Sequence, residues 1–422
     1  MNQKSKFHYA WWILIALSII VGVGKGAINN TAGLFLTSVT EDLGIGMGSL
    51  SLYFSVSAVV TLFFLPIGGK LMAKYDTRLI LSMGIVLQAG AFALFGFMSS
   101  VWGWYLLAIP LAVGGVFITV IAGPVIINQW FKKSNGLALG VLSAVGGGIG
   151  AISQIIAAAL IGDFGWRYAY MMVGGVAILI VVPIVILLIK RSPQAHGVLP
   201  YGAEDVNVGQ ENVQGVSAAE AGIDMATAKK STALYMLIVF FFFLTSIASF
   251  SMHIPTYLKN QGFDIAFAGN IMGTYMIGVL IGSLVLGFLV DKLGSKYTAI
   301  LAMIAGIIAI CLLLFANKST AMITIAVVLF SLIGSSIGIV APALTSTIFG
   351  KKAYSEIYST ASLGLAISSI IALPAYGFVY DATGSYTTVL YAIMIMLVIN
   401  IGCIFIAFNN KKKLIKQGAW TD

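Results

Sequence analysis

Charged residues and cysteines are both scarce in this chain. Asp, Glu, Lys and Arg make up 9% of the 422 residues, against roughly 25% in an ordinary soluble domain, while 59% are hydrophobic. This number of charged residues is too small to cover a water-soluble surface. Most of the chain is therefore expected to face lipid or other helices. The two cysteines, Cys311 and Cys403, lie inside apolar runs, which argues against a disulfide scaffold and against a metal-thiolate site.

The sequence patterns of several chemistries are also missing. The chain has no CxxC, HExxH or Walker-type motif, and no paired acids or Ser/His/Asp set within reach along a helix. We therefore expect no enzyme activity, no metal, no cofactor and no ATP-driven step within the chain. The net charge of +9 could indicate a nucleic-acid partner. Because the basic residues stand in small groups between long apolar runs, nucleic-acid binding is not expected.

Apolar runs between polar breaks predict twelve membrane-spanning helices and therefore an all-α membrane protein. The first run is too long for a removable signal peptide and lacks a small-residue cleavage site, so it is expected in the mature protein. The expected spans are residues 10–37, 46–73, 79–99, 103–130, 136–162, 168–189, 233–258, 265–290, 297–316, 320–349, 355–380 and 386–408.

Lys and Arg are distributed unequally between the two sides of these spans. Nineteen of the 23 lie on the side of both termini, and three, Arg167, Lys259 and Lys318, lie on the other. Because positively charged loops resist translocation, both termini are expected in the cytoplasm, with the spans in the cytoplasmic membrane. The expected parts are an N-terminal six-helix bundle (1–190), a cytoplasmic linker (191–232), a C-terminal six-helix bundle (233–410) and a cytoplasmic tail (411–422).

The linker is polar and carries no run able to span a membrane. Its composition is typical of a flexible tether. A short surface helix is predicted near residues 217–228.

Two loops repeat one motif. Gly287–Lys296 closes one apolar run and opens the next, and a worn copy, Gly69–Arg78, lies 218 residues earlier. Each copy has a glycine where two helices would cross closely, then basic residues for the cytoplasmic surface. With twelve spans and a central linker, these loops resemble those of the major facilitator superfamily over essentially the whole chain. The resemblance implies two pseudo-symmetric six-helix bundles, transport by alternating access and function as a monomer.

The first loop copy departs from the family pattern. Ala73 stands where the family has an acid, and Asp76 where it has glycine. The resemblance therefore implies that the N-terminal half of a latch between helices is weakened. The residues expected to hold conformational contacts are Lys74, Arg78, Gly287, Asp291, Lys292 and Lys296.

Shorter motifs resemble the monocarboxylate and oxalate/formate branch of this family. They are Gly33–Leu36, Glu41–Gly44, Trp130–Phe131, Gly136–Gly140, the glycines of 146–150, Gly165–Tyr170 and His253–Tyr257. The resemblance implies a small organic anion such as lactate, pyruvate or formate, moved by proton symport or, alternatively, by exchange of the oxalate/formate type. The anion ligands of that branch are missing, because their places are taken by Asn30, Val279, Ser283 and Leu365.

Lys25 could replace the missing ligands. At about 1.5 Å per residue it would lie on the order of 20 Å from the cytoplasmic start of its span. An ammonium group there costs at least about 2.5–3.5 kcal/mol, so it is expected to face water, substrate or a partner. Lys25 is predicted to bind the anion with Asn29, one turn later. Alternatively, Lys25 is structural, and the substrate is a zwitterion, a neutral solute or a drug.

His253 is a second titratable group within a span. His253 and Lys25 are both candidates for proton coupling. The alternative for His253, beside Pro255, is a structural hydrogen bond. The further candidates for substrate binding could each serve helix packing instead; they are Tyr53, Gln154, His253, Tyr257, Tyr275 and Ser335.

Overall fold

A computed structural model describes residues 8–131, 134–190, 193, 198–202, 222–316 and 319–420. Within them, eleven helical stretches are long and apolar enough to cross a membrane. One of these stretches contains two spans, because α7 (Asn135–Leu188) changes direction at Gly165, where φ is 78° and ψ is 162°. The all-α membrane fold and the twelve predicted spans are therefore confirmed in the described part of the chain.

Three of the spans are built from several helical pieces. The first consists of α1 (Tyr9–Val21), the π-helix η1 (Gly22–Asn29) and α2 (Ala32–Leu43). The fourth consists of α5 (Val101–Gly115), the π-helix η3 (Val116–Ile121) and α6 (Ala122–Trp130). The seventh consists of α10 (Thr232–Ser249), the 3₁₀ turn η6 (Phe250–His253) and α11 (Ile254–Asn260).

Besides the two spans in α7, the remaining seven spans are continuous or consist of two pieces. They are α3 (Met47–Lys74), α4 (Thr77–Leu94) with the 3₁₀ turn η2 (Phe95–Phe97), α12 (Ile265–Leu293), α13 (Ser295–Leu314), α14 (Thr320–Phe349), α15 (Tyr354–Ala361) with α16 (Leu363–Thr383), and α17 (Thr387–Lys416).

The first span continues six residues beyond its predicted end. Helix α2 runs to Leu43 and stops at Gly44, which has φ 63° and so takes the left-handed conformation that glycine adopts without strain. The acids Glu41 and Asp42 are exposed but still helical. Hydropathy ends a span at its last apolar residue, whereas the hydrogen-bonded helix ends at the residue that reverses the chain.

The chain packs as two compact units. Unit 1 comprises Met1–Ile45, Val56–Gly215 and Ile265–Gly273, and unit 2 comprises Gly46–Ser55, Val216–Asp264 and Thr274–Asp422. Each unit therefore includes the first residues of a helix, α3 or α12, whose remainder belongs to the other unit.

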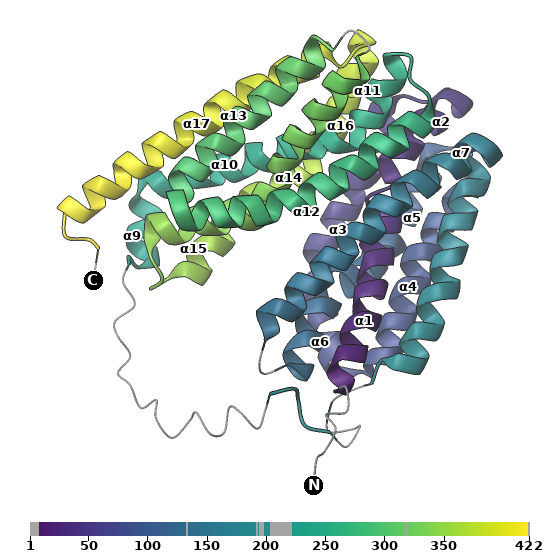
Figure 1. The fold of residues 1–422 in the computed structure, drawn as a ribbon, viewed down its shortest axis with the longest axis horizontal. Helices are drawn as coiled ribbons and strands as arrows, with labels where there is room; N and C mark the ends of the chain where they lie inside the picture. Colours follow the sequence, from purple (N-terminus) through teal and green to yellow (C-terminus); the bar gives the residue numbers. More distant parts are fainter. Residues whose placement is uncertain are drawn as a thin grey trace. The chain divides into compact units, whose positions relative to one another are not determined.

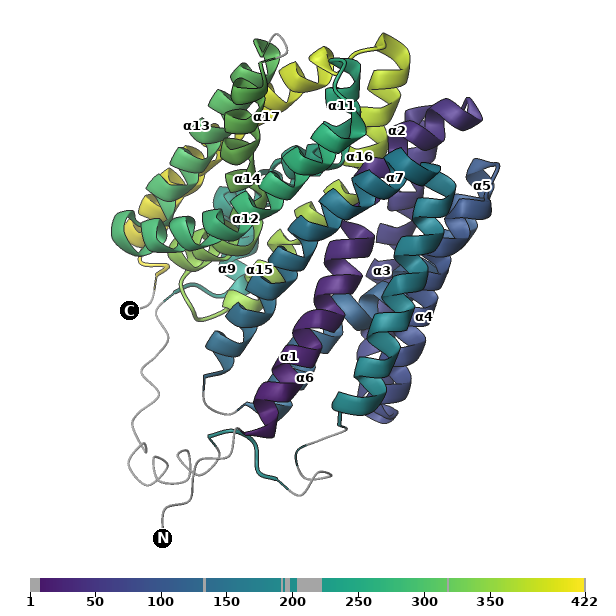
Figure 2. The ribbon, with the colours of Figure 1, turned by 45° about the vertical axis from the view of Figure 1, so that its right-hand side comes forward.

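In unit 1, α1 and η1 pack against both legs of α7 (Figure 2). At its start, the Tyr9 hydroxyl donates to the Leu188 carbonyl at 2.9 Å. Farther along, Gly26 meets Gly150 so closely that an ideal Cβ on Gly26 would lie 2.7 Å from the Gly150 nitrogen. The glycine series of α7 therefore lets the first span approach it backbone to backbone.

Two of the short sequence motifs meet at one corner of unit 1. The Arg167 guanidinium lies 3.5 Å from the Asp42 carboxylate, and the Trp166 indole N–H donates to the same carboxylate at 3.1 Å. Arg167 also donates to the carbonyls of Gly96 and Met98, just after α4. These contacts tie the ends of α2 and α4 to the bend of α7.

In unit 2, α10, α13 and α17 run side by side (Figure 1). Helices α12 and α14 approach each other through small residues. An ideal Cβ on Gly282 would lie 2.7 Å from the Ser335 hydroxyl oxygen, and that hydroxyl donates to the Val279 carbonyl at 2.8 Å. Small side chains and a bond to a backbone carbonyl are the usual means of close helix packing in lipid.

The two loop copies start their helices differently. The Asp76 carboxylate caps α4 by accepting the Arg78 backbone N–H at 2.8 Å, whereas Gly294 precedes α13 with φ 80° and ψ 159°. The close helix crossing predicted at Gly69 and Gly287 stays a prediction. An ideal Cβ on either glycine would meet no described atom within 4 Å, because both face open space.

Two described segments of the linker form backbone hydrogen bonds with the ends of helices. The Tyr201 N–H donates to the Trp130 carbonyl at 2.9 Å in unit 1, and the Ile223 N–H donates to the Phe349 carbonyl at 3.0 Å in unit 2. A short helix, α9 (Met225–Lys230), overlaps the end of the predicted helix and runs two residues past it, whereas residues 222–224 are not helical; the Asp224 carboxylate caps α9. The first five residues of the predicted helix, 217–221, lie outside the described residues.

Candidate functional site

The first span widens into a π-helix at η1. The Asn30 N–H donates to the Lys25 carbonyl, five residues earlier, at 2.9 Å. The sequence favours this turn because glycines at 22, 24 and 26 weaken the α-helix and leave room for neighbours. An ideal Cβ on Gly24 would lie 2.4 Å from Ile118, which belongs to the second π-helix, η3. Single π turns within membrane helices are frequent at functional sites.

Lys25 and Asn29 are the two exposed residues of η1. The glycines on either side of Lys25 and the neighbouring Ile28 are buried. Lys25 forms no hydrogen bond or ion pair with any residue that the structure describes. The π-helix η1 therefore exposes an ammonium group and, about one helical turn later on the same face, an amide group.

Gln88 of α4 holds this turn from behind. Its side chain is fully buried, and its amide nitrogen donates to the Gly24 carbonyl at 3.0 Å and to the Asn29 side-chain oxygen at 3.1 Å. Its own oxygen is buried without a described hydrogen-bond partner. Gln88 was not among the residues predicted from the sequence. An amide in the mostly apolar run 79–99 nevertheless indicates a functional or structural role, because buried polar groups in membrane spans are costly.

Gln154 of α7 holds the other end of the turn. Its amide nitrogen donates to the Asn30 carbonyl at 2.7 Å, and its side chain is fully buried. The structure therefore places Gln154 against the turn that carries Lys25 and Asn29, but buried beneath the turn rather than on its surface. Contact between Gln154 and a substrate stays a prediction.

The remaining substrate-binding candidates are all buried, with at most 4% of each residue exposed. The Tyr257 hydroxyl donates to the Leu313 carbonyl at 2.6 Å, and the Tyr53 ring stacks on Phe54. Substrate contact by these residues stays a prediction, since each is engaged in packing in this conformation. The buried candidates are Tyr53, His253, Tyr257, Tyr275 and Ser335.

His253 lies at the end of the 3₁₀ turn η6 and is fully buried. Its Nε2 lies 3.0 Å from the Leu373 carbonyl, and its Nδ1 lies 2.8 Å from the Tyr386 hydroxyl. Because a carbonyl only accepts, Nε2 carries the hydrogen and the Tyr386 hydroxyl donates to Nδ1 of a neutral ring. Both nitrogens thus have the partners that a structural histidine needs, while the proton-coupling role stays a prediction.

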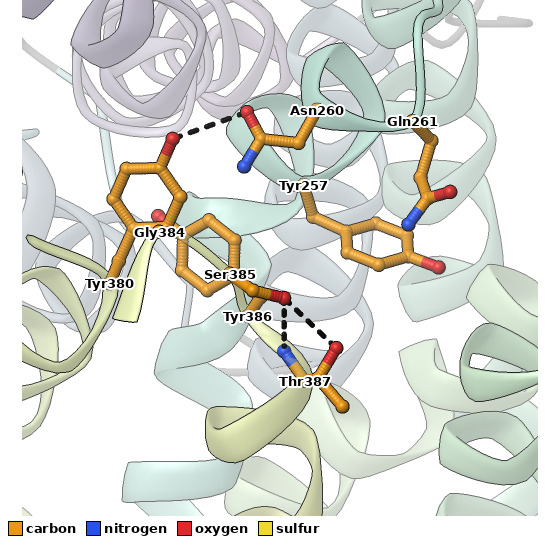
Figure 3. A pocket seen from close by; sticks show the side chains of 8 residues that line it. All are labelled: Tyr257, Asn260, Gln261, Tyr380, Gly384, Ser385, Tyr386 and Thr387. Carbon is orange, nitrogen blue, oxygen red and sulfur yellow. Dashed lines mark hydrogen bonds between the residues drawn. The ribbon is translucent and has the colours of Figure 1, made fainter. Parts of the chain in front are cut away.

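Unit 2 also contains a cavity of about 240 Å³ beside this histidine. Figure 3 shows the Tyr380 hydroxyl pointing at Asn260, to which it donates at 3.2 Å. No charged side chain lines the cavity, so it offers an anion no counter-charge, and the described residues contain no group of His, Cys, Asp or Glu able to hold a metal. The lining residues are Tyr257, Asn260, Gln261, Tyr380, Gly384, Ser385, Tyr386 and Thr387.

The residues expected to hold conformational contacts are mostly engaged close by. Arg78 donates to the Ile189 carbonyl at 2.7 Å, Lys74 lies over the Tyr75 ring, and Lys292 lies over the Phe288 ring. None of these contacts tests the expected latch between helices, which stays a prediction. The other expected members are Lys296, which lies over the Phe405 and Phe408 rings; Asp291, which forms no ion pair with a described residue; and the open Gly287.

Comparisons with known proteins agree with the fold. A family model described as Major Facilitator Superfamily matches residues 16–269 and 236–419. Monocarboxylate transporter 13 of Rattus norvegicus is 23% identical over 385 residues, covering 89% of this chain and 84% of that protein. The oxalate:formate antiporter of Oxalobacter formigenes is 26% identical over 141 residues, a third of each chain.

Other matches extend the comparison without narrowing the substrate. A multidrug transporter protein of Bacillus subtilis is 22% identical over 393 residues, covering 84% of this chain and 71% of that protein. A crystal structure of a bacterial homologue of the human lysosomal transporter Spinster, in an inward-facing and occupied conformation, superimposes with a TM-score of 0.71 at 15% identity. It covers 96% of this chain and 98% of the other, so the fold is shared along the whole length.

Proposed function

This chain belongs to the major facilitator superfamily and is a multi-pass membrane transporter, and from that premise we propose that it carries a small organic anion by alternating access. The observation that carries the proposal is the exposed Lys25 ammonium on η1, which pairs with no residue that the structure describes, with the Asn29 amide one turn later. An ammonium at this depth of a span is stable only beside water or a counter-charge. Lys25 is exposed and no described carboxylate pairs with it, so its ammonium is available to an anionic substrate as a counter-charge.

Monocarboxylates such as lactate, pyruvate or formate fit this pair of groups. A carboxylate accepts a charge-assisted bond from the ammonium with one oxygen and an amide hydrogen with the other. The resemblance to the monocarboxylate and oxalate/formate branch supports the same class, as do two relatives, a monocarboxylate transporter and an oxalate:formate antiporter.

Proton symport is the proposed mode of coupling, with Lys25 and His253 as candidates for the proton. Exchange of one anion for another is the second candidate, favoured by the match to the oxalate:formate antiporter. The protein is proposed to act as a monomer in the cytoplasmic membrane with both termini in the cytoplasm, which the distribution of Lys and Arg supports.

Uptake of labelled lactate, pyruvate, formate and oxalate into proteoliposomes tests the proposal, with and without an inward proton gradient. We expect saturable uptake of at least one acid that falls at least about tenfold in Lys25→Ala, since a hydrogen bond to a charged group contributes about 1.5–3 kcal/mol. Stimulation by the gradient would indicate symport, whereas stimulation only by internal anion would indicate exchange. Folded protein that transports none of the acids would overturn the proposal.

A further inference from the structure

We propose that Gln88 is a positioning residue that makes the surface formed by Lys25 and Asn29 a donor of hydrogen bonds only. Such a surface selects a monocarboxylate over a zwitterion of the same carbon skeleton. The inference rests on the proposed function and adds the property that decides between two substrates of similar size.

The geometry fixes the orientation of both amides. Gly24 offers a carbonyl oxygen to Gln88, so the Gln88 atom 3.0 Å away is its nitrogen. The second hydrogen of that nitrogen needs another acceptor, and the atom of Asn29 at 3.1 Å is therefore the side-chain oxygen. With its oxygen turned toward buried Gln88, Asn29 directs its NH₂ group away from Gln88, on the exposed side of η1.

The buried oxygen of Gln88 shows that this arrangement has a cost. That oxygen has no described partner, although an unpaired buried acceptor loses its hydration without compensation. A leucine at this position would avoid that loss but would leave the Gly24 carbonyl and the Asn29 oxygen without this donor. The amide therefore serves the two acceptors that it contacts rather than the packing of α4.

The chemical consequence follows from the inventory of donors. The Lys25 ammonium and the Asn29 NH₂ group both donate, and neither accepts. A carboxylate satisfies both with its oxygens, and a hydroxyl or keto oxygen on the next carbon is also an acceptor. The ammonium group of an amino acid would find no acceptor here and would lie close to a like charge, so zwitterions are excluded.

The test compares lactate with alanine, which share a carbon skeleton and differ in a hydroxyl against an ammonium group. In proteoliposomes, KM for labelled lactate and the inhibition constant of unlabelled alanine are measured for wild type, Gln88→Leu and Asn29→Asp. We expect wild type to favour lactate by at least about a hundredfold, and Gln88→Leu to reduce that ratio by at least about tenfold. Asn29→Asp keeps an acceptor for Gln88 but exposes a carboxylate oxygen, and is expected to reverse the preference.

Gln154→Leu is the matched control. Gln154 is equally buried and also donates to a carbonyl of the turn, but to Asn30 and without a bond to Asn29. Its removal is expected to lower stability and to leave the lactate-to-alanine ratio within about twofold of wild type. If Gln88→Leu does not fold, Gln88→Met, which keeps the length of the side chain and also lacks the amide donor, is measured in its place.

The outcomes separate this inference from the proposed function. If folded wild type transports no acid, the proposed function fails first. If wild type transports lactate but binds alanine equally well, or if folded Gln88→Leu keeps the wild-type ratio, the positioning role of Gln88 is overturned while anion transport stands.

Discussion

Lys25 lies in the first span of the N-terminal half and His253 in the first span of the C-terminal half, yet these two titratable side chains have opposite surroundings. Lys25 stands on a widened π turn, exposed and without a described ion-pair partner. His253 ends a tightened 3₁₀ turn, fully buried and bonded through both ring nitrogens. The Leu373 carbonyl and the Tyr386 hydroxyl of neighbouring spans bond to His253, whereas no described residue forms a hydrogen bond or ion pair with Lys25.

The two copies of the loop motif also differ in how the helix that follows each of them begins. Asp76 starts α4 with a side-chain cap at an ordinary φ of −64°, whereas Gly294 starts α13 at φ 80° and ψ 159°, a conformation open essentially to glycine alone. One half uses a side chain to satisfy the first N–H groups of the helix, and the other uses backbone freedom. The first loop copy, which departs from the family pattern, therefore starts its helix by a different means at the same position in the motif.

Removing the imidazole is expected to have the largest effect on stability. His253→Ala leaves the Leu373 carbonyl and the Tyr386 hydroxyl without their partner and opens a cavity, at a cost of about 2–5 kcal/mol. Denaturant unfolding in detergent measures it, and Tyr386→Phe, which removes only one of the bonds, is expected to cost about 1 kcal/mol. A stable His253→Ala protein that has lost only its response to a proton gradient would instead make His253 the coupling residue.

The second loop copy is expected to tolerate a side chain poorly. Gly294→Ala forces a residue with a Cβ into φ 80°, at a cost of about 1–3 kcal/mol, although no described atom would clash with that Cβ. The thermal midpoint of purified protein measures the loss. Gly287→Ala is the control, because Gly287 lies within α12 and also faces open space, and alanine favours a helix there. Equal midpoints for the two variants would contradict the argument from backbone strain.

Substitution of Asp76 in the first loop copy is expected to lower stability less. Asp76→Ala removes the cap of α4 and costs about 1 kcal/mol, while Asp76→Asn or Asp76→Ser should retain most of the stability. Asp76→Gly, which restores the family's residue, should cost only a few tenths of a kcal/mol by the same measurement. A larger loss for Asp76→Gly than for Asp76→Ala would show that the carboxylate is not acting as a helix cap.

The spans could be predicted from the sequence, because the length and apolarity of a run report directly on whether it can cross a membrane. The exposure of Lys25 could also be predicted, since an ammonium at that depth has few alternatives. The π turn beneath it could not, because hydropathy carries no information about which carbonyl an N–H reaches. Gln88 was missed for a related reason: its role depends on Gly24 and Asn29, and nothing in one sequence pairs residues 64 and 59 positions apart.

The smallest expected effect on stability is at Lys25, and this contrast with His253 is the sharpest test of the comparison. Lys25→Met keeps the length of the side chain and removes a charge that has no described partner, so the free energy of unfolding should stay within about 0.5 kcal/mol of wild type. Anion uptake should nevertheless fall at least about tenfold, while Lys25→Arg, which keeps the charge, should retain more of it. A Lys25→Met protein as unstable as His253→Ala would mean that the ammonium bonds within the fold, as the structural alternative requires. Stable protein with unchanged uptake would separate Lys25 from transport altogether.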